Sequence, residues 1–312
     1  MAKIKKIPKS KIKNLKAEIQ LGFETNLIKS NPMIVDLLQN NRQIYYASYD
    51  SNELLGAISL YSEGLKKTKW EYKGLYIGDF PHEITKKLIN YTVNKYGGAG
   101  AERFVVYIPE RYNQLIELLK KECMFRGCGD IDVFKKNIEN YSDEFPQIAL
   151  QDFKEEDTVP LLELYNYCLF PQFRQSLSTD KNYWKKRLAK ACDKKVLYIS
   201  NIMEGYYSLH NPSENVFYAD ILMSEFYQSM YNALVQYAIA KVKSINPKAD
   251  LYFAVKKFHQ SSKNYLTVMK DFQFELDESY ATMVRDYWDL IKQNTKEEKA
   301  SSLLFDKMGS PA

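Results

Sequence analysis

The chain has 312 residues and a formal net charge of +5, and its 45% hydrophobic and 27% charged residues are typical of a globular protein long enough for two domains. No apolar run approaches the roughly 18 residues of a membrane span, four cysteines are too few for a disulfide scaffold, and no apolar segment follows the basic start as in a secretory signal. We therefore exclude disordered, membrane-spanning and disulfide-scaffolded chains, and we expect a cytoplasmic protein.

The first part of the chain divides into short elements, because apolar periodic segments alternate with Gly, Pro and Asn turns. Residues 11–40 predict one or two short helices broken at Asn31-Pro32. Two strand-like runs flank a turn at residues 50–52 and predict a hairpin. The remaining pattern predicts strands over 44–49, 54–61 and 70–78, a helix over 82–96, a strand over 104–108, a helix over 112–121 and a strand over 130–135.

A similar order of elements begins again after residues 137–146, a short polar stretch that we interpret as a linker. Ser224 stands before a long apolar periodic segment and is expected to cap that helix. The pattern predicts a strand that opens at 148–150, helices over 158–167 and 179–190, hairpin strands over 196–201 and 205–209, a strand over 216–223, a helix over 225–244, a strand over 251–255, a helix over 261–270 and a strand over 280–285.

The two series indicate an internal repeat. An offset of 149 residues aligns Phe104 with Phe253 and Val106 with Val255. We therefore expect two similar domains, over residues 1–140 and 147–289. Residues 290–312 are predicted to form a tail.

The positive charge is local. Residues 1–140 carry 23 basic and 16 acidic side chains, and seven of those lysines lie in the first sixteen residues. Only seven of the 44 basic residues are arginine, the residue type that binds phosphates and bases in pairs, so a nucleic-acid partner is not expected. The three histidines lie far apart without a Cys or His at zinc spacing, so no metal site is expected.

Each half has the predicted order strand, two helices, hairpin, strand, long helix, strand, helix, strand. This order resembles the GCN5-related N-acetyltransferase (GNAT) fold, and its duplication resembles the tandem members of that superfamily. The resemblance implies a mixed α/β chain of two tandem GNAT-like domains, each a mixed, mostly antiparallel sheet flanked by helices, in a monomer or a homodimer. In that family the fourth strand splays from the fifth and acyl-coenzyme A lies in the V-shaped gap. The implied co-substrate is therefore acetyl-CoA or another acyl-CoA, and the implied acceptor is a small amine.

The first family signature is a loop, Q/R-x-x-G-x-G/A, whose backbone N–H groups hold the pyrophosphate at the start of a helix. Residues 228–233 match it in the second half, except that a tyrosine replaces the first glycine. Residues 78–84 of the first half keep none of the pattern and place Asp79 and Glu83 at the helix start. The second half is thus the better candidate. The resemblance implies these cofactor-binding residues: Leu222, Met223, Ser224, Gln228, Ser229, Tyr231 and Ala233.

The second family signature is N-x-x-A-x-x-x-Y before a terminal G-F, and its tyrosine often protonates the departing thiolate. In the second half, residues 273–274 fill the G-F positions, and counting back places Met269 at the tyrosine, Tyr265 at the alanine and Ser262 at the asparagine. In the first half, the same count leaves only Asn113 in agreement. Both halves therefore lack the usual acid.

For the second half we expect direct attack of a neutral amine on the thioester, with the acyl oxygen held by backbone N–H groups near Met223. Asp220 or Glu225, acting through water, is expected to take the amine proton. Tyr227 or Tyr265 would replace the missing acid.

Two further segments are candidates for the acceptor side, which this fold builds from loops. Residues 170–176 interrupt the first two helices of the second half, where Phe173 could form a substrate wall and Arg174 could bind a carboxylate; packing is the alternative. Residues 259–262 follow a strand, where they either line the acceptor cleft or cap the next helix.

Two alternatives to this enzyme remain. A catalytically inactive GNAT-fold binding or scaffold protein would explain why both halves depart from the motifs. An aminoacyl-tRNA-type transferase would use a bulkier donor, but the neutral body and few arginines argue against an RNA partner. The space beside Tyr231 discriminates the first alternative from the enzyme, because a filled gap in both halves favours the scaffold.

Overall fold

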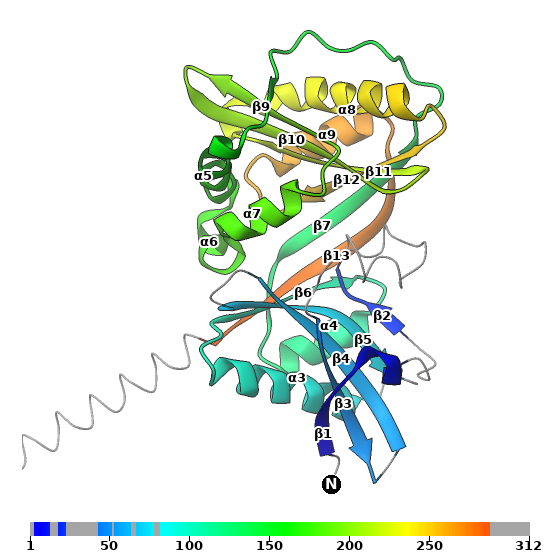
Figure 1. Cartoon of the computed structure of the whole chain (residues 1–312), viewed down its shortest axis with the longest axis vertical. Helices are drawn as coiled ribbons and strands as arrows, with labels where there is room; N and C mark the ends of the chain where they lie inside the picture. Colours follow the sequence, from blue (N-terminus) through cyan, green and yellow to red (C-terminus); the bar gives the residue numbers. More distant parts are fainter. Residues whose placement is uncertain are drawn as a thin grey trace, which may run out of the picture.

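A computed structural model describes residues 3–12, 18–22, 43–51, 53–63, 67–77 and 82–287. The chain has a mixed α/β fold, and its strands join into one large, mostly antiparallel sheet (Figure 1). The expected tail over 290–312, residues 78–81 and most of the expected helical region over 11–40 lie outside the described residues.

The amino-terminal part of the chain, to the end of β7, supplies the elements of the first half. They are β1 (Lys3–Ile7), η1 (Lys9–Ile12), β2 (Glu18–Gln20), β3 (Ile44–Asp50), β4 (Glu53–Glu63), β5 (Lys69–Ile77), α3 (His82–Gly97), β6 (Arg103–Pro109), α4 (Asn113–Glu122) and β7 (Arg126–Asn137).

The rest of the described chain supplies the elements of the second half. They are β8 (Gln151–Asp152), η2 (Glu155–Asp157), α5 (Thr158–Cys168), α6 (Pro171–Leu177), α7 (Lys181–Leu188), β9 (Asp193–Ile199), β10 (Ile202–Ser213), β11 (Val216–Met223), η3 (Glu225–Met230), α8 (Tyr231–Ile245), β12 (Asp250–Lys256), α9 (Ser262–Asp271) and β13 (Glu275–Asp286).

The two halves exchange their last strands. The sheet order is β1-β3-β4-β5-β6-β13-β7-β12-β11-β10-β9-β8, so β13 of the second half lies between β6 and β7, and β7 of the first half lies between β13 and β12. β13 pairs with β6 in a register that places Val284 opposite Val105, and β7 pairs with β12 with Val133 opposite Ala254. Figure 1 shows β7 and β13 running together from one half into the other. Each half therefore completes its sheet with a strand from the other half.

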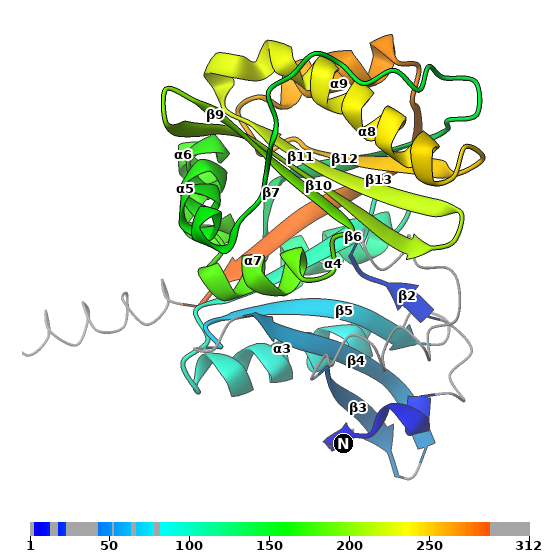
Figure 2. The same ribbon diagram turned by 45° about the horizontal axis from the view of Figure 1, so that its top comes forward.

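Helices cover the sheet on both faces in the second half (Figure 2). α8 and α9 pack on one face, where Leu234 and Val268 join a buried cluster with Phe217 of β11. α5 and α7 pack on the other face, where Leu161 and Trp184 belong to a second cluster. That second cluster continues through the exchanged strands to Val105 of β6 and Val284 of β13, in addition to Val133 of β7. On this face of the sheet, the core of the described residues is therefore continuous between the two halves.

Several expected elements differ from the structure. The expected helix over 225–244 is two elements, η3 and α8, because Tyr227 has a non-helical backbone (φ −117°, ψ 23°). The expected strand opening at 148–150 begins at Gln151 instead. Residues 170–176 were expected as a loop, but all except Phe170 lie in α6. Pro171 is the first residue of this helix, a position where the backbone needs no N–H donor. Ser224 makes no side-chain cap bond to η3.

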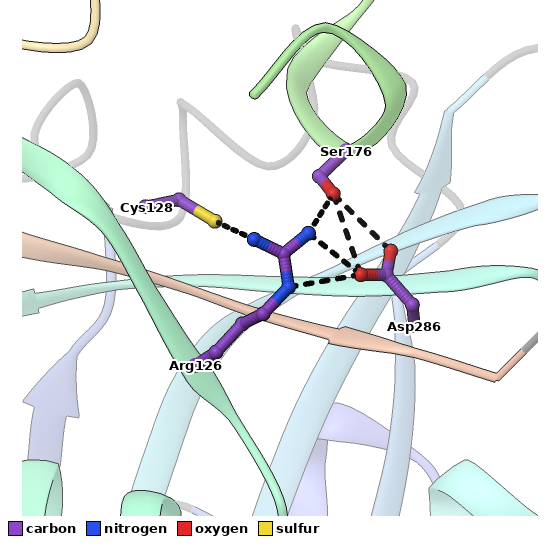
Figure 3. Close-up of polar contacts among 4 residues, drawn as sticks. All are labelled: Arg126, Cys128, Ser176 and Asp286. Carbon is purple, nitrogen blue, oxygen red and sulfur yellow. Dashed lines mark hydrogen bonds and ion pairs between the residues drawn. The ribbon is translucent and has the colours of Figure 1, made fainter. Parts of the chain in front are cut away.

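A polar cluster ties the exchanged strands to α6 (Figure 3). Arg126, at the start of β7, donates from Nε and Nη2 to Oδ2 of Asp286, at the end of β13, at 3.1 and 2.8 Å. The same Nη2 donates to Ser176 Oγ on α6, and Ser176 donates in turn to Asp286 Oδ1 at 3.3 Å. Arg126 Nη1 also contacts Cys128 Sγ at 3.2 Å. We call these four residues the strand clasp, because they join α6 of the second half to the ends of both exchanged strands.

The strand exchange predicts that neither half folds independently. A fragment of residues 1–140 lacks β13, which leaves the edges of β6 and β7 unpaired, and residues 141–312 lack β7. We expect each fragment alone to show no cooperative urea transition, and an equimolar mixture to regain the far-UV circular dichroism of the full chain. A cooperative transition of fragment 1–140 at the midpoint of the full chain would contradict the exchange.

The strand clasp predicts a measurable loss of stability. Asp286→Ala removes the carboxylate that accepts two hydrogen bonds from the Arg126 guanidinium and one from the Ser176 hydroxyl. Because Arg126 is about half exposed, solvent weakens this ion pair. We therefore expect the free energy of unfolding to fall by about 1–2 kcal/mol. Lys121→Ala removes an exposed pair with Glu117 on α4 and is the matched control, with an expected change below about 0.5 kcal/mol. Equal changes in the two variants, measured by urea denaturation, would show that the clasp has no special role.

Candidate functional site

In the second half, the parallel pairing of β11 and β12 stops part of the way along both strands. The register runs from Val216 opposite Asp250 to Ala219 opposite Phe253 and goes no further. Residues 220–223 of β11 and the segment from Ala254 to Ser261 therefore bound a place where the two strands are not joined by their backbones. We call this place the second-half gap.

Side chains fill the second-half gap. Tyr231, the first residue of α8, is buried, and its hydroxyl lies 2.8 Å from Ser261 Oγ. Ser261 donates to the carbonyl oxygen of Met223 at 3.1 Å, so Tyr231 donates to Ser261. The Tyr231 ring stacks on Tyr265 with centroids 4.4 Å apart. The phenol of Tyr231, at the position of the expected glycine, thus connects the loop after β12 to the last residue of β11.

The loop after β12 is also tied to the end of α5. Phe170 N donates to Phe258 O at 3.0 Å, and Gln260 N donates to Cys168 O at 2.8 Å. The Cys168 thiol donates to Met223 O at 3.3 Å. These bonds bring α5 against the end of β11, and no spacing in the sequence indicated that Cys168 would lie there.

Three buried polar atoms around the second-half gap have no hydrogen-bond partner among the described residues: Ser224 Oγ, Tyr265 Oη and His259 Nε2. Burial is the main cause that lowers the pKa of His259 to about 3, so its ring is neutral near pH 7. Burial also raises the pKa of Tyr265 well above its ordinary value, so its phenol keeps its proton. A buried polar group without a partner costs about 1–3 kcal/mol, so each of these three atoms on the segments that bound the gap calls for an explanation.

Asp220, an expected base, is held in a buried ion-pair cluster. Its Oδ2 lies 3.0 Å from Arg187 Nη2 on α7, and its Oδ1 lies 3.1 Å from Lys256 Nζ on β12. Burial opposes ionisation of Asp220, but the positive charges of Lys256 and Arg187 outweigh it and hold the pKa of Asp220 well below its ordinary value. A carboxylate with two cationic partners and a low pKa accepts protons weakly.

The other expected site residues lie at or near the end of β11. Glu225, the first residue of η3, accepts a hydrogen bond from Tyr167 Oη at 2.9 Å. Tyr227 is half-buried in η3. The structure thus gathers Met223, Ser224, Tyr231 and Tyr265 at the gap. The remaining expected cofactor residues lie beside this group, at Leu222 on β11, Gln228 and Ser229 in η3 and Ala233 in α8.

The two expected acceptor residues lie on α6. Arg174 donates from Nε to Leu169 O at 3.2 Å and from Nη2 to Tyr167 O at 3.1 Å. Its guanidinium therefore fastens the end of α5. Phe173 is partly buried and packs against the cluster under α5 and α7.

The equivalent place in the first half is filled by backbone. β5 and β6 pair only from Lys69 opposite Arg103 to Glu71 opposite Val105. Beyond that point β2 pairs with β5, with Gln20 opposite Gly74. Leu21 N donates to Lys73 O of β5 at 3.1 Å, and Gly22 N donates to Tyr107 O of β6 at 2.9 Å.

The expectation of one or two short helices over residues 11–40 is therefore wrong at residues 18–20, which form β2. Ile19 and Leu21 are buried and Gln20 between them is exposed, which is the period-two pattern of a strand. The splayed strands β5 and β6 offer backbone groups that a strand can bond and a helix cannot. Leu21 also joins the first-half core beside Tyr72 and Val106.

Among the described residues, no group of three or more His, Cys, Asp or Glu side chains is arranged to hold a metal ion. No helix in the same part of the chain is long and apolar enough to cross a membrane.

The buried ion-pair cluster predicts a pH-dependent contribution to stability. Asp220→Asn leaves two cations buried without their counter-charge and is expected to lower the free energy of unfolding by about 3–5 kcal/mol at pH 7. Because the pKa of Asp220 is lower in the folded chain than in the unfolded one, this contribution is present above about pH 4 and is lost as the pH falls further. Urea titrations at pH 7 and pH 3 measure it, and a difference that grows at pH 3 would contradict the assignment.

No protein-family model and no curated protein matches the sequence. Solved structures do match the fold. A tandem GNAT protein from the clavulanic acid biosynthesis pathway is 10% identical, with a TM-score of 0.58 over 92% of this chain and 99% of that one. A GCN5-related N-acetyltransferase from Sphaerobacter thermophilus is 11% identical, with a TM-score of 0.54 over 78% and 80% of the two chains. One from Anabaena variabilis is 12% identical, with a TM-score of 0.50 over 92% and 73%.

Identities this low establish the fold and leave the activity open. These structures match the fold over most of this chain, and the resemblance stated from the sequence is confirmed at the level of fold. The chain has a tandem GNAT fold.

Proposed function

We propose that the chain is an N-acyltransferase that takes its acyl group from an acyl-CoA, such as acetyl-CoA, passes it to a small amine, and does so in the second half. The observation that carries the proposal is the second-half gap with its unpartnered Ser224, Tyr265 and His259. A ligand in the gap would supply partners that the described residues do not.

The way each half is closed supports the choice of half. In the first half, β2 pairs with β5, Gly22 just after it bonds through its backbone to β6, and Leu21 is part of the core. In the second half, the side chains of Tyr231 and Ser261 fill the gap. A side chain changes rotamer at far smaller cost than a strand leaves a sheet, so the second half opens more readily.

The residues at the gap fit the chemistry of acyl transfer. An acyl-CoA would supply the thioester, whose carbonyl carbon the amine nitrogen attacks as the carbon–sulfur bond breaks. Tyr265 is the proposed acid for the departing thiolate. Its phenol keeps its proton near pH 7, and its pKa, which burial raises in the closed gap, falls once Tyr231 leaves and the hydroxyl gains polar surroundings. Glu225, half-exposed beside the end of β11, can accept the amine proton through water, whereas the ion-paired Asp220 is a weaker acceptor.

A second candidate function, a GNAT-fold binding protein without catalysis, has a specific observation in its favour. Tyr231 replaces the glycine of the phosphate loop and is fully buried in a hydrogen-bonded chain to Met223. Protein atoms thus fill the gap in both halves.

Calorimetry with acetyl-CoA separates the two candidates. We expect the native chain to bind at most one acetyl-CoA, with micromolar affinity, and Tyr231→Gly to bind it more tightly because no phenol has to leave the gap. Tyr231→Phe keeps the ring and is the matched control. Tyr231→Ala provides a second test if the glycine variant folds poorly at the start of α8.

Binding by Tyr231→Gly with none by the native chain would favour the binding protein. Two bound molecules per chain would contradict the closure of the first half, and no binding by any folded variant would contradict the proposed donor.

Tyr265→Phe tests the proposed acid. Its hydroxyl has no partner in the described chain, so we expect the free energy of unfolding to stay the same or to rise by up to about 1 kcal/mol. The turnover number for acyl transfer, measured by thiol release, should fall by about 10²-fold while the KM for acetyl-CoA changes little. A destabilised variant with unchanged turnover would assign Tyr265 to the core alone.

A further inference from the structure

Two aromatic rings are exposed at the end of β11, on the side of the sheet that α5 covers. Phe226 of η3 is 73% exposed, and Tyr167 at the end of α5 is 39% exposed. Their rings are stacked, with centroids 6.5 Å apart and planes 23° apart. Exposed rings offer their negative faces to a cation.

Two carboxylates, those of Glu225 and Glu204, lie near this aromatic pair. Glu225 accepts the hydrogen bond of Tyr167 Oη at 2.9 Å. Burial is the main cause that raises the pKa of the adjacent Cys168 thiol to about 12, and the negative charges of Glu204 and Glu225 add to it. Both carboxylates therefore lie close to the end of α5.

The nearby cation, Arg174, forms no ion pair with Glu225 in the described part of the chain. The positive charge of Arg174 lowers the pKa of the same thiol. Its Nε and Nη2 donate to the backbone carbonyls of Leu169 and Tyr167. Ser224 lies directly before Glu225 and is only 1% exposed. Its hydroxyl has no hydrogen-bond partner in the described chain. Aromatic faces and negative charge thus meet at the end of β11, next in the chain to the buried hydroxyl of Ser224.

We propose that Tyr167, Phe226 and Glu225 form a binding site for an organic ammonium ion with an apolar body. The ammonium contacts the ring faces and the Glu225 carboxylate, and the apolar body lies along Phe226. The assignment of this cation as the acyl acceptor rests on the proposed function, whereas the binding itself does not.

The position suits an acceptor. α5 and α8 cover opposite faces of the sheet (Figure 2), and Tyr231 enters the second-half gap from the α8 side. An amine held by Glu225 approaches the end of β11 from the α5 side. A donor beside α8 and an amine beside α5 would meet at Met223 and Ser224.

The test measures binding of phenethylammonium by calorimetry in the absence of any acyl-CoA, with 2-phenylethanol as the neutral analogue. We expect the cation to bind about tenfold or more tightly than the alcohol. Glu225→Gln and Phe226→Ala should each weaken binding of the cation about threefold or more. Leu276→Ala removes an exposed apolar side chain on β13 and should leave binding unchanged. All these side chains are at least partly exposed, so urea denaturation should show the variants folded.

Equal binding of cation and alcohol, or binding that Glu225→Gln leaves unchanged, would overturn the site. Its failure is distinguishable from failure of the proposed function. Acetyl-CoA binding without cation binding would reject only the ammonium site, and cation binding without acetyl-CoA binding would reject only the acyltransferase.

Discussion

The antiparallel pairing of β7 with β13 is the interaction on which the rest of the structure depends. Each of these strands finishes the sheet of the half that it does not come from, so their mutual pairing holds both sheets in one. The buried cluster under α5 and α7 crosses the same strands without a break and reaches β6. The strand clasp then ties α6 to their ends (Figure 3). The loops that face the second-half gap are thereby anchored on strands that the first half also uses.

Duplication of one fold has produced two differently closed halves. Both place a parallel strand pair at the centre, and in both the pairing stops after a few residues. The exposed strand edges that result must be satisfied, because unpaired backbone groups are costly when buried. In the first half, β2 does this with backbone bonds, and Leu21 adds apolar burial. In the second half, the hydroxyl of Ser261 and the thiol of Cys168 bond to Met223. Ser224, Tyr265 and His259 each keep a polar atom without a partner among the described residues. This asymmetry is the reason why we propose the second half, and not the first, as the place for acyl transfer.

Local patterns in the sequence were enough to predict most elements. The runs around Val106, Ile221 and Val255 are strands as expected, because apolar residues and flanking turns determine a strand locally. The partner of a strand is not local, so the exchange of β7 and β13 could not be predicted from either segment. β2 is three residues long and was absorbed into an expected helix. The break at Tyr227 was missed because the apolar period continues through it.

The candidate site was predictable only in part. The fold resemblance located the end of β11, and the glycine replacement at Tyr231 raised the question of a filled gap, which the structure answers. The resemblance could not indicate that Arg187 and Lys256 neutralise Asp220, because these residues come from two separate elements. Tyr167 and Phe226 were missed for a similar reason, since each is an ordinary aromatic until α5 and η3 bring the rings together.

A crystal structure with bound acetyl-CoA tests the central claim most directly, which is that the two halves are closed differently and only the second half opens. The account predicts the ligand between β11 and β12, Tyr231 turned away from Ser261, and residues 18–22 still paired with β5. A ligand between β5 and β6, with β2 displaced, would contradict it.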